Sequence, residues 1–332
     1  MEGLSLVIPI YNVELYLEKC LLSIAESMPL PNNIQVILVD DGSTDQSGEI
    51  AEKFAEEHTG FEFYRKTNGG LSDARNYGIP YALYDYVSFI DSDDLIEKQY
   101  FDKVLTALQE RPDLVIFDWI DVQDGHKPVI ISGMDFEDVL WSTQPSAWNK
   151  VFKKSLFNNI QFPVGKVYED VGTIYKLLYF VENYIYINEP LSKYRKNRKG
   201  SILTTVSPKI NDLYSALDDT YNFYRSKDEF SQEQQDGLCY QHVKLLVWSN
   251  MYRQLKFYKF NFLGFHRKME MTRELLYRRF PEWKNNNHLN RNAPYFESRL
   301  GNNYISQLDQ IGVSPFSTFK TLSYAIAKNR KR

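Results

Sequence analysis

The chain has 332 residues, of which 43% are hydrophobic and 25% charged, so it is long enough to bury a large core and to form two domains. Its formal net charge of -4 at pH 7 argues against a general nucleic-acid-binding protein, which needs a strongly basic surface. Only two cysteines occur, Cys20 and Cys239, without partners at metal-site or redox-motif spacing, which argues against a disulfide framework or a zinc site.

The N-terminus, Met1-Glu2-Gly3, leads directly into an apolar segment and lacks the basic region and cleavage site of a secretory signal. No apolar run approaches the length needed to cross a bilayer. We therefore expect a cytoplasmic protein that is at most peripheral to the inner face of a membrane.

Short apolar strands alternate with amphipathic helices over the first hundred residues. Strands are predicted over residues 4–9, 34–39, 61–64 and 87–90, and helices over residues 14–27, 47–58 and 72–83. Strand-helix alternation with short connections predicts an α/β fold with a mainly parallel sheet covered by helices on both faces.

Polar residues follow three of these strands at the point where each strand ends. The segments are Pro9-Ile10-Tyr11-Asn12, Asp40-Asp41-Gly42-Ser43 and Asp91-Ser92-Asp93-Asp94. The carboxyl ends of parallel strands meet at one sheet edge, where ligands bind in open α/β sheets. In extended backbone Asp91 and Asp93 point to the same side, and such a pair suits a hard divalent cation whose other ligands are phosphates. A helix cap or a solvated turn is the alternative.

No glycine-rich dinucleotide motif follows the first strand, and no P-loop occurs. Instead, four ordered motifs resemble a family 2 glycosyltransferase with the GT-A, Rossmann-like fold. They are Ile8-Pro9-Ile10-Tyr11-Asn12, Val39-Asp40-Asp41-Gly42-Ser43-Thr44-Asp45, Asn68-Gly69-Gly70-Leu71-Ser72 with Ala74-Arg75-Asn76, and Phe89-Ile90-Asp91-Ser92-Asp93-Asp94. A weaker similarity continues through Trp148-Asn149-Lys150, Glu169-Asp170 and Tyr194-Arg195, to about residue 200.

The resemblance implies a UDP-sugar donor, a Mn²⁺ or Mg²⁺ ion, and transfer with inversion at the anomeric carbon. Asp93 is the implied metal ligand, and Asp91 is implied to bind ribose or to reach the metal through water. The predicted donor-binding residues are Pro9, Tyr11, Asn12, Asp40, Asp41, Asn68, Gly70, Arg75, Asp91, Ser92, Arg195, Arg198 and Ser201.

Several of these residues keep a second interpretation. Tyr11 either stacks on the pyrimidine ring or fills a gap beneath the next helix. Asp41 either accepts the imide N–H of uracil or, like Asp40, caps a helix. Arg75 pairs with phosphate, with a carboxylate of the metal motif, or with a surface acid.

Inversion requires a base for the acceptor hydroxyl, and the resemblance assigns this role to Asp170, with Glu169 orienting the acceptor. Helix-dipole stabilisation alone also favours two acids at the start of the helix predicted over residues 171–180. Trp148 and Trp141 either form the floor of an acceptor site or pack in the core. The basic segment 194–202 is expected to close over the pyrophosphate, unless it is a solvated linker.

Helical periodicity replaces the strand pattern from about residue 207, with one stripe through Leu213, Leu217, Tyr221 and Tyr224 and a longer helix over residues 238–257. We therefore predict a catalytic domain over residues 1–206 and a helical domain over residues 207–332. The last segment, 316–332, is apolar on one side and basic at its end. It either packs on its own bundle, or contacts a membrane or another subunit.

The predicted activity is the inverting, metal-dependent transfer of a hexose or N-acetylhexosamine from a UDP-sugar to a hydroxyl group. The expected acceptor is a growing surface polysaccharide, a glycoprotein glycan or a lipid-linked glycan, and no nucleic acid is expected as a partner. The alternative is a non-catalytic sugar-nucleotide-binding subunit that acts as a scaffold for a partner transferase.

Overall fold

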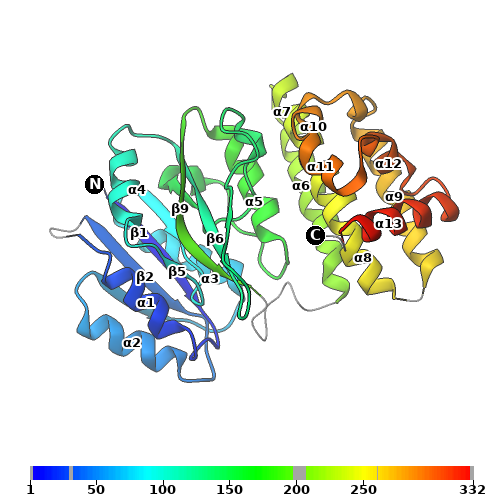
Figure 1. Ribbon diagram of the computed structural model, residues 1–332. Helices are drawn as coiled ribbons and strands as arrows, with labels where there is room; N and C mark the ends of the chain where they lie inside the picture. Colours follow the sequence, from blue (N-terminus) through cyan, green and yellow to red (C-terminus); the bar gives the residue numbers. More distant parts are fainter. Residues whose placement is uncertain (1–2, 30–32, 197–206, 260, 330–332) are drawn as a thin grey trace. The chain divides into compact units, whose positions relative to one another are not determined.

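The computed structural model describes residues 3–29, 33–196, 207–259 and 261–329 (Figure 1). The chain divides into two compact units, Met1–Ile202 and Leu203–Arg332, and each is described by itself.

The described part of the first unit contains a nine-stranded sheet with the strand order β3-β2-β1-β4-β8-β6-β9-β5, and β7 pairs with β6. The strands are β1 Leu4–Ile10, β2 Ile34–Asp40, β3 Phe61–Arg65, β4 Tyr86–Phe89, β5 Leu95–Ile96, β6 Leu114–Val122, β7 Val129–Ile131, β8 Lys150–Lys153 and β9 Tyr184–Arg195.

Strands β1 to β4 form the parallel half of the sheet, as predicted, with β1 between β2 and β4. Strands β1 and β2 are buried over their whole length, because helices cover both faces. One face packs on α1 (Leu17–Ala25), α2 (Ser47–Glu57) and α4 (Tyr100–Leu108). On the other face α3 (Leu71–Gly78) lies so close that a Cβ atom at Gly78 would sit 2.5 Å from Val7 Cγ1.

The second half of the sheet is mixed rather than parallel. Strand β8 runs antiparallel to both of its neighbours, β4 and β6, whereas β6 and β9 are parallel. The prediction of a mainly parallel sheet therefore holds for β1 to β4 but not for the sheet as a whole.

Two predicted helices are shorter in the structure, where α1 begins at Leu17 and α3 ends at Gly78. A 3₁₀ turn, Ile79–Tyr81, follows α3, because Pro80 has no N–H to continue the α-helical hydrogen bonds. Helix α5, Glu169–Leu177, begins directly with the predicted acid pair.

Among its described residues, the second unit contains helices joined by turns, and no strand. Its helices are α6 Asp212–Arg225, α7 Gln232–Gln241, α8 Asn250–Tyr258, α9 Phe262–Arg279, α10 Asn287–Arg291, α11 Ala293–Leu300, α12 Tyr304–Gln310 and α13 Pro315–Asn329. A π-helical stretch, His242–Ser249, joins α7 to α8. The helix predicted over residues 238–257 is therefore part of one continuous helical segment. Among the described residues, no helix combines the length and apolar character that a membrane span requires.

Candidate active site

The carboxyl ends of β2, β1 and β4 lie side by side and present the polar segments expected from the sequence. The backbone N–H of Asp41 donates to Ile10 O at 2.8 Å, and that of Ile90 donates to Val7 O at 3.2 Å. The ends of three neighbouring strands are thus tied together, and the three segments share one edge of the sheet.

Arg75 of α3 is the centre of a buried charge cluster. Its side chain is 1% exposed, and Nη2 donates to Asp91 Oδ1 at 2.9 Å. Its Nη1 donates to Asp170 Oδ1 at 2.7 Å and to Glu169 Oε1 at 3.3 Å. One guanidinium therefore joins the acidic segment after β4 to the start of α5. This burial rules out a surface ion pair.

Three carboxylates around one guanidinium leave an excess of negative charge. Burial, followed by the charge of Asp170, raises the pKa of Glu169 to about 7. Burial also raises the pKa of Asp170, although Arg75 opposes this shift. Burial alone would lower the pKa of Arg75, but Asp170, Asp91 and Glu169 together raise it above its ordinary value. Arg75 is therefore permanently charged, whereas Glu169 changes its protonation near neutral pH.

Asp94 is buried and holds β9 rather than the following helix. It accepts the backbone N–H of Arg195 at 2.7 Å, and Arg195 Nε donates to Asp93 O at 3.3 Å. Burial, then the charges of Asp91 and Asp93, raise the pKa of Asp94. Ser92 is buried between these acids. Arg198 and Ser201 lie outside the described residues.

Tyr11 and Asn12 lie in the loop after β1, beyond the buried Pro9. The Tyr11 side chain is 47% exposed, so it does not fill a gap beneath a helix. Asn12 has a left-handed backbone conformation, with φ of 50°, and its Oδ1 accepts the backbone N–H of Thr44 at 2.8 Å. Asn12 thus ties the loop after β1 to the loop after β2.

Asp40 and Asp41 are both buried, and neither caps α2. Asp40 accepts hydrogen bonds from the Ser43 backbone and from Arg65 Nε. The Asp41 carboxylate accepts from Lys66 Nζ at 2.6 Å, from the Gly69 N–H at 2.9 Å and from the Gly70 N–H at 2.7 Å.

Asn68 Nδ2 donates to the backbone carbonyl of Asp41 at 3.0 Å. Asp41 and Asn68 therefore both fix the loop that leads into α3, the helix that carries Arg75.

Trp148 is partly exposed and stacks on Tyr194, with ring centroids 5.0 Å apart and an interplanar angle of 1°. It also meets Trp119 edge to face at 4.9 Å. Trp141 is buried and packs in the core, so of the two tryptophans considered for the acceptor only Trp148 presents a surface.

Lys150 on β8 supports the site, although no role was predicted for it from the sequence. Its fully buried Nζ donates to Gln144 O at 2.6 Å, to Ser146 O at 2.9 Å and to Asn149 Oδ1 at 2.7 Å. The N–H of Ala147, in the same turn, donates to Asp170 Oδ2 at 3.1 Å. Lys150 thus fixes the turn whose Ala147 N–H binds Asp170. Burial lowers its pKa to about 7. One feature of the sequence could have indicated that Lys150 is buried. It lies two residues before the apolar Phe152, which places both side chains on the same face of a strand.

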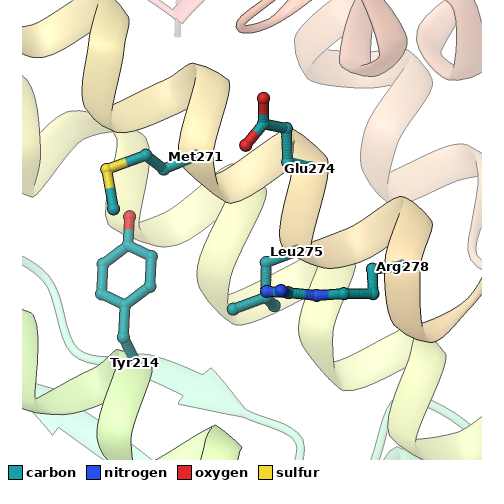
Figure 2. A pocket seen from close by; sticks show the side chains of 5 residues that line it. All are labelled: Tyr214, Met271, Glu274, Leu275 and Arg278. Atoms are coloured by element: carbon teal, nitrogen blue, oxygen red, sulfur yellow. The ribbon is translucent and has the colours of Figure 1, made fainter.

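The described residues contain no group of three or more His, Cys, Asp or Glu side chains placed to hold a metal ion. A pocket of about 380 Å³ lies in the second unit, between α6 and α9 (Figure 2). Tyr214, Met271, Glu274, Leu275 and Arg278 line it, and none of these is a predicted site residue.

Known proteins that are similar to this chain identify its family and its fold. The model of the family "Glycosyl transferase family 2" matches residues 5–167. Glycosyltransferase GlyG of Streptococcus pneumoniae is 33% identical over 225 residues, which are 61% of this chain and 74% of GlyG. Glycosyltransferase GlyA of the same organism is 34% identical over 221 residues, 60% of this chain but only 31% of GlyA, so this chain spans about a third of that relative.

Among solved structures, S. aureus TarS 1-349 in complex with UDP-GlcNAc aligns with a TM-score of 0.70 at 21% identity, over 98% of this chain and 92% of that one. The predicted α/β GT-A fold followed by a helical C-terminal region is thereby confirmed. The family match, the extent of the similarity to GlyG and the shared fold lead to one conclusion: the chain belongs to the family 2 glycosyltransferases.

Proposed function

We propose that the chain transfers a hexose or N-acetylhexosamine from a UDP-sugar to a hydroxyl of a bacterial surface glycan, with inversion at the anomeric carbon. The observation that carries this proposal is the Arg75 cluster. It brings Asp91, of the proposed metal motif, and Asp170, the proposed base, to the same guanidinium.

The choice of a UDP-linked donor rests on relatives and on Tyr11. TarS has been solved with UDP and with UDP-GlcNAc, which supports the same nucleotide here. The exposed ring of Tyr11, beyond the central strand, offers a surface on which a pyrimidine can stack. Asn12 ties this loop, which follows Pro9 of β1, to the loop after β2, and Asp41 and Asn68 fix the loop that leads into α3.

Asp93 and Asp91 are the residues proposed to hold Mn²⁺ or Mg²⁺. Their carboxylates supply hard oxygen ligands, and one or two such groups suffice when substrate phosphates complete the shell. Asp94 is not available, because it is buried and binds the Arg195 backbone. When bound, the ion neutralises charge on the departing diphosphate. A mannosyltransferase of Pyrobaculum calidifontis, which aligns with a TM-score of 0.57 at 16% identity, has been solved with GDP-Man and Mn²⁺.

Asp170 is the proposed base that accepts the proton of the acceptor hydroxyl. Arg75 binds one of its oxygens, and the Ala147 N–H binds the other, so its orientation is fixed from two sides. Burial raises the pKa of Asp170 above its ordinary value and so makes it a stronger proton acceptor, which suits this role. Glu169 is proposed to orient the acceptor.

A relative and the partly exposed Trp148 support the choice of acceptor. Minor teichoic acid biosynthesis protein GgaB of Bacillus subtilis is 44% identical over 107 residues, 32% of this chain and 12% of GgaB. This relative supports a surface polymer as acceptor. The partly exposed Trp148, rigidly stacked on Tyr194, is the proposed platform for an acceptor sugar.

UDP release from a panel of UDP-sugars, measured with Mn²⁺ and again with EDTA, tests the proposal. We expect release from at least one donor that depends on the metal. Binding of a UDP-sugar without any release or transfer would instead support the non-catalytic scaffold subunit.

The variant Asp170→Asn tests the role of the base. Loss of a general base typically slows turnover by about 10² to 10⁴-fold, and we expect a decrease of this order in UDP release. UDP binding, measured by calorimetry, is expected to persist, because Asp170 is not among the proposed donor-binding residues. Asp124→Asn, in an exposed turn, is the matched control. Near-normal turnover of Asp170→Asn would remove the assignment.

A further inference from the structure

Two segments of the second unit contain no acidic residue. Residues 253–269 and 310–332 together carry ten of the 39 Lys and Arg residues of the chain and none of its 43 Asp and Glu residues. In a chain with a net charge of -4, this is a marked separation of charge.

Within the described residues, these two segments contact each other through α9 and α13. The rings of Phe262 on α9 and Phe319 on α13 are 5.7 Å apart, in an edge-to-face arrangement. His266 Nδ1 and Thr318 Oγ1 are 3.1 Å apart. The fold therefore combines two basic stretches, about fifty residues apart in the sequence, into one region.

Helix α13 uses only one face for packing. Thr318, Thr321, Leu322 and Ala325 are buried against the bundle. On the other face Phe316 is 76% exposed and Phe319 is 57% exposed. Helix α13 thus packs on its own bundle and still presents two aromatic rings to solvent, so the alternatives left open by the sequence are not exclusive.

Leu263, at the start of α9, is 61% exposed and lies one residue from Phe262, the ring partner of Phe319. Exposed basic residues accompany these apolar side chains on α13, on α9 and at the end of α8. We define the basic-apolar patch as Leu263, Phe316 and Phe319 together with Lys256, Lys259, Arg267 and Lys320.

We infer that the basic-apolar patch docks the protein on an anionic lipid bilayer. Phe and Leu side chains enter the boundary between headgroups and acyl chains, while lysine and arginine are attracted to anionic headgroups. A soluble polyanion would satisfy the basic residues but would leave Phe316 and Leu263 in water. The nearest acid that borders the 310–332 segment, Asp309, is already paired with Lys284 at 2.8 Å and with Arg273 at 3.4 Å.

Sedimentation of the full chain with vesicles tests this inference. The probes are vesicles of phosphatidylcholine alone and vesicles in which roughly a third of the lipid is phosphatidylglycerol. We expect at least about tenfold stronger partitioning to the anionic vesicles, weakened by salt as screening shortens the range of the attraction. Equal binding to both vesicle types, or no binding to either, overturns the inference.

Two variants separate the apolar and the basic contributions. Phe316→Ser combined with Phe319→Ser, and Lys256→Gln combined with Arg267→Gln and Lys320→Gln, are each expected to reduce partitioning about tenfold or more. All five side chains are exposed, so both proteins should fold normally, as circular dichroism can verify.

The matched control is Val129→Ser combined with Ile130→Ser, because this pair is also exposed and apolar but lies on β7 of the first unit. If the control lowers binding as much as the Phe variant, the patch is not the site. If the wild type sediments as a dimer that the Phe variant dissociates, and vesicles are not bound, the patch is an interface between copies and the lipid assignment is wrong.

Discussion

At Arg75, one planar guanidinium binds acids from two separate elements of the chain. Its two terminal nitrogens point to different partners, with Nη2 on Asp91 and Nη1 on Asp170 and Glu169. The ammonium group of a lysine is a single point charge and does not reproduce this fork. The ring centroids of Phe162 and Phe89 lie 5.3 and 5.9 Å from the guanidinium carbon, and the two rings exclude water from the guanidinium. Arg75 therefore couples the proposed metal motif to the proposed base.

Replacing Arg75 with methionine is expected to destabilise the protein strongly. Removal of one partner from a buried ion pair typically costs about 3 to 5 kcal/mol, because the remaining charges are left buried and unpaired. The decrease in the free energy of unfolding should be smaller at pH 5 than at pH 8, since the carboxylates can bind protons at pH 5. Urea unfolding at both pH values measures it. Lys103→Met breaks the exposed pair with Glu189 and should change the unfolding free energy by less than about 1 kcal/mol. An equally small effect of Arg75→Met would contradict the prediction.

Lys150 should make stability depend on pH in a defined direction. Its pKa is about 7 in the folded protein, against an ordinary value of 10.5. Between these values the unfolded chain binds a proton that the folded chain does not, so the free energy of unfolding rises with pH, by at most about 1.4 kcal/mol per pH unit. Lys150→Met is expected to abolish this rise between pH 7 and pH 9 and to slow UDP release by misplacing Asp170.

The control for Lys150 is Lys153→Met, three residues along the same strand. Lys153 is partly exposed and pairs with Asp113 at 3.0 Å. This variant should keep the pH dependence of the wild type. If urea unfolding shows the same rise with pH in Lys150→Met, the ammonium of Lys150 is not the group responsible.

Among the elements, the parallel half of the sheet could be predicted from the sequence. Strands that are buried on both faces appear as nearly continuous apolar runs, as β1 and β2 do. Strand β8 gives no such signal, since it has four residues and a lysine at each end. Strand β9 contains Pro190, close to an irregularity in its pairing with β6. The mixed half of the sheet was therefore not assigned.

Only part of the candidate site, like only part of the sheet, could be predicted from the sequence. The acids after β2 and β4 were found from the sequence because a strand that ends in carboxylates has a local signature. One partner was among the predicted alternatives, because Arg75 was expected to pair with phosphate or with a carboxylate of the metal motif, and it binds Asp91. The other partners were not found. Asp41 meets Gly69 and Gly70, and Arg75 meets Asp170, across 28 to 95 residues of sequence. Such pairings arise from the packing of α3 and α5, and no local pattern encodes them. The position of Lys150 on the same side of a strand as Phe152 was a local signal of burial, but its bonds to the turn that binds Asp170 follow from the fold.

The start of α3 supports a prediction at the level of the element. Gly70 has φ of 90° and ψ of 174°, a conformation open essentially only to glycine, and a Cβ there would meet nothing within 4 Å. Gly70→Ala should therefore lower the unfolding free energy by about 1 to 3 kcal/mol through backbone strain alone. The strain disturbs the loop bound to Asp41, so UDP should bind more weakly, as calorimetry can show.

Gly125→Ala is the matched control, since Gly125 also has a positive φ and open space around it but lies in the turn between β6 and β7. It should lose stability without losing affinity for UDP. Equal affinities of the two variants would show that the Gly70 loop does not contribute to the nucleotide site.

At the scale of the whole molecule, average properties conceal local ones. A net charge of -4 coexists with an acid-free basic region in the second unit and with an acidic cluster at the sheet edge of the first. The acidic cluster includes Asp91 of the proposed metal site, and the basic region contains the surface proposed to bind anionic lipid. The overall charge argues against general nucleic-acid binding, but it does not determine the charge at either local site.

The proposed metal also makes a prediction for the stability of the intact chain. A ligand that binds only the folded state at about 100 times its Kd raises the unfolding free energy by about 2.7 kcal/mol. UDP should therefore raise the thermal midpoint clearly in Mn²⁺ and much less in EDTA, because the ion would join the diphosphate to the carboxylates of Asp93 and Asp91. Asp93→Asn is expected to remove the difference between Mn²⁺ and EDTA, whereas Asp124→Asn, in an exposed turn, should preserve it. An equal shift with UDP in Mn²⁺ and in EDTA for the wild type would show that nucleotide binding does not use a metal.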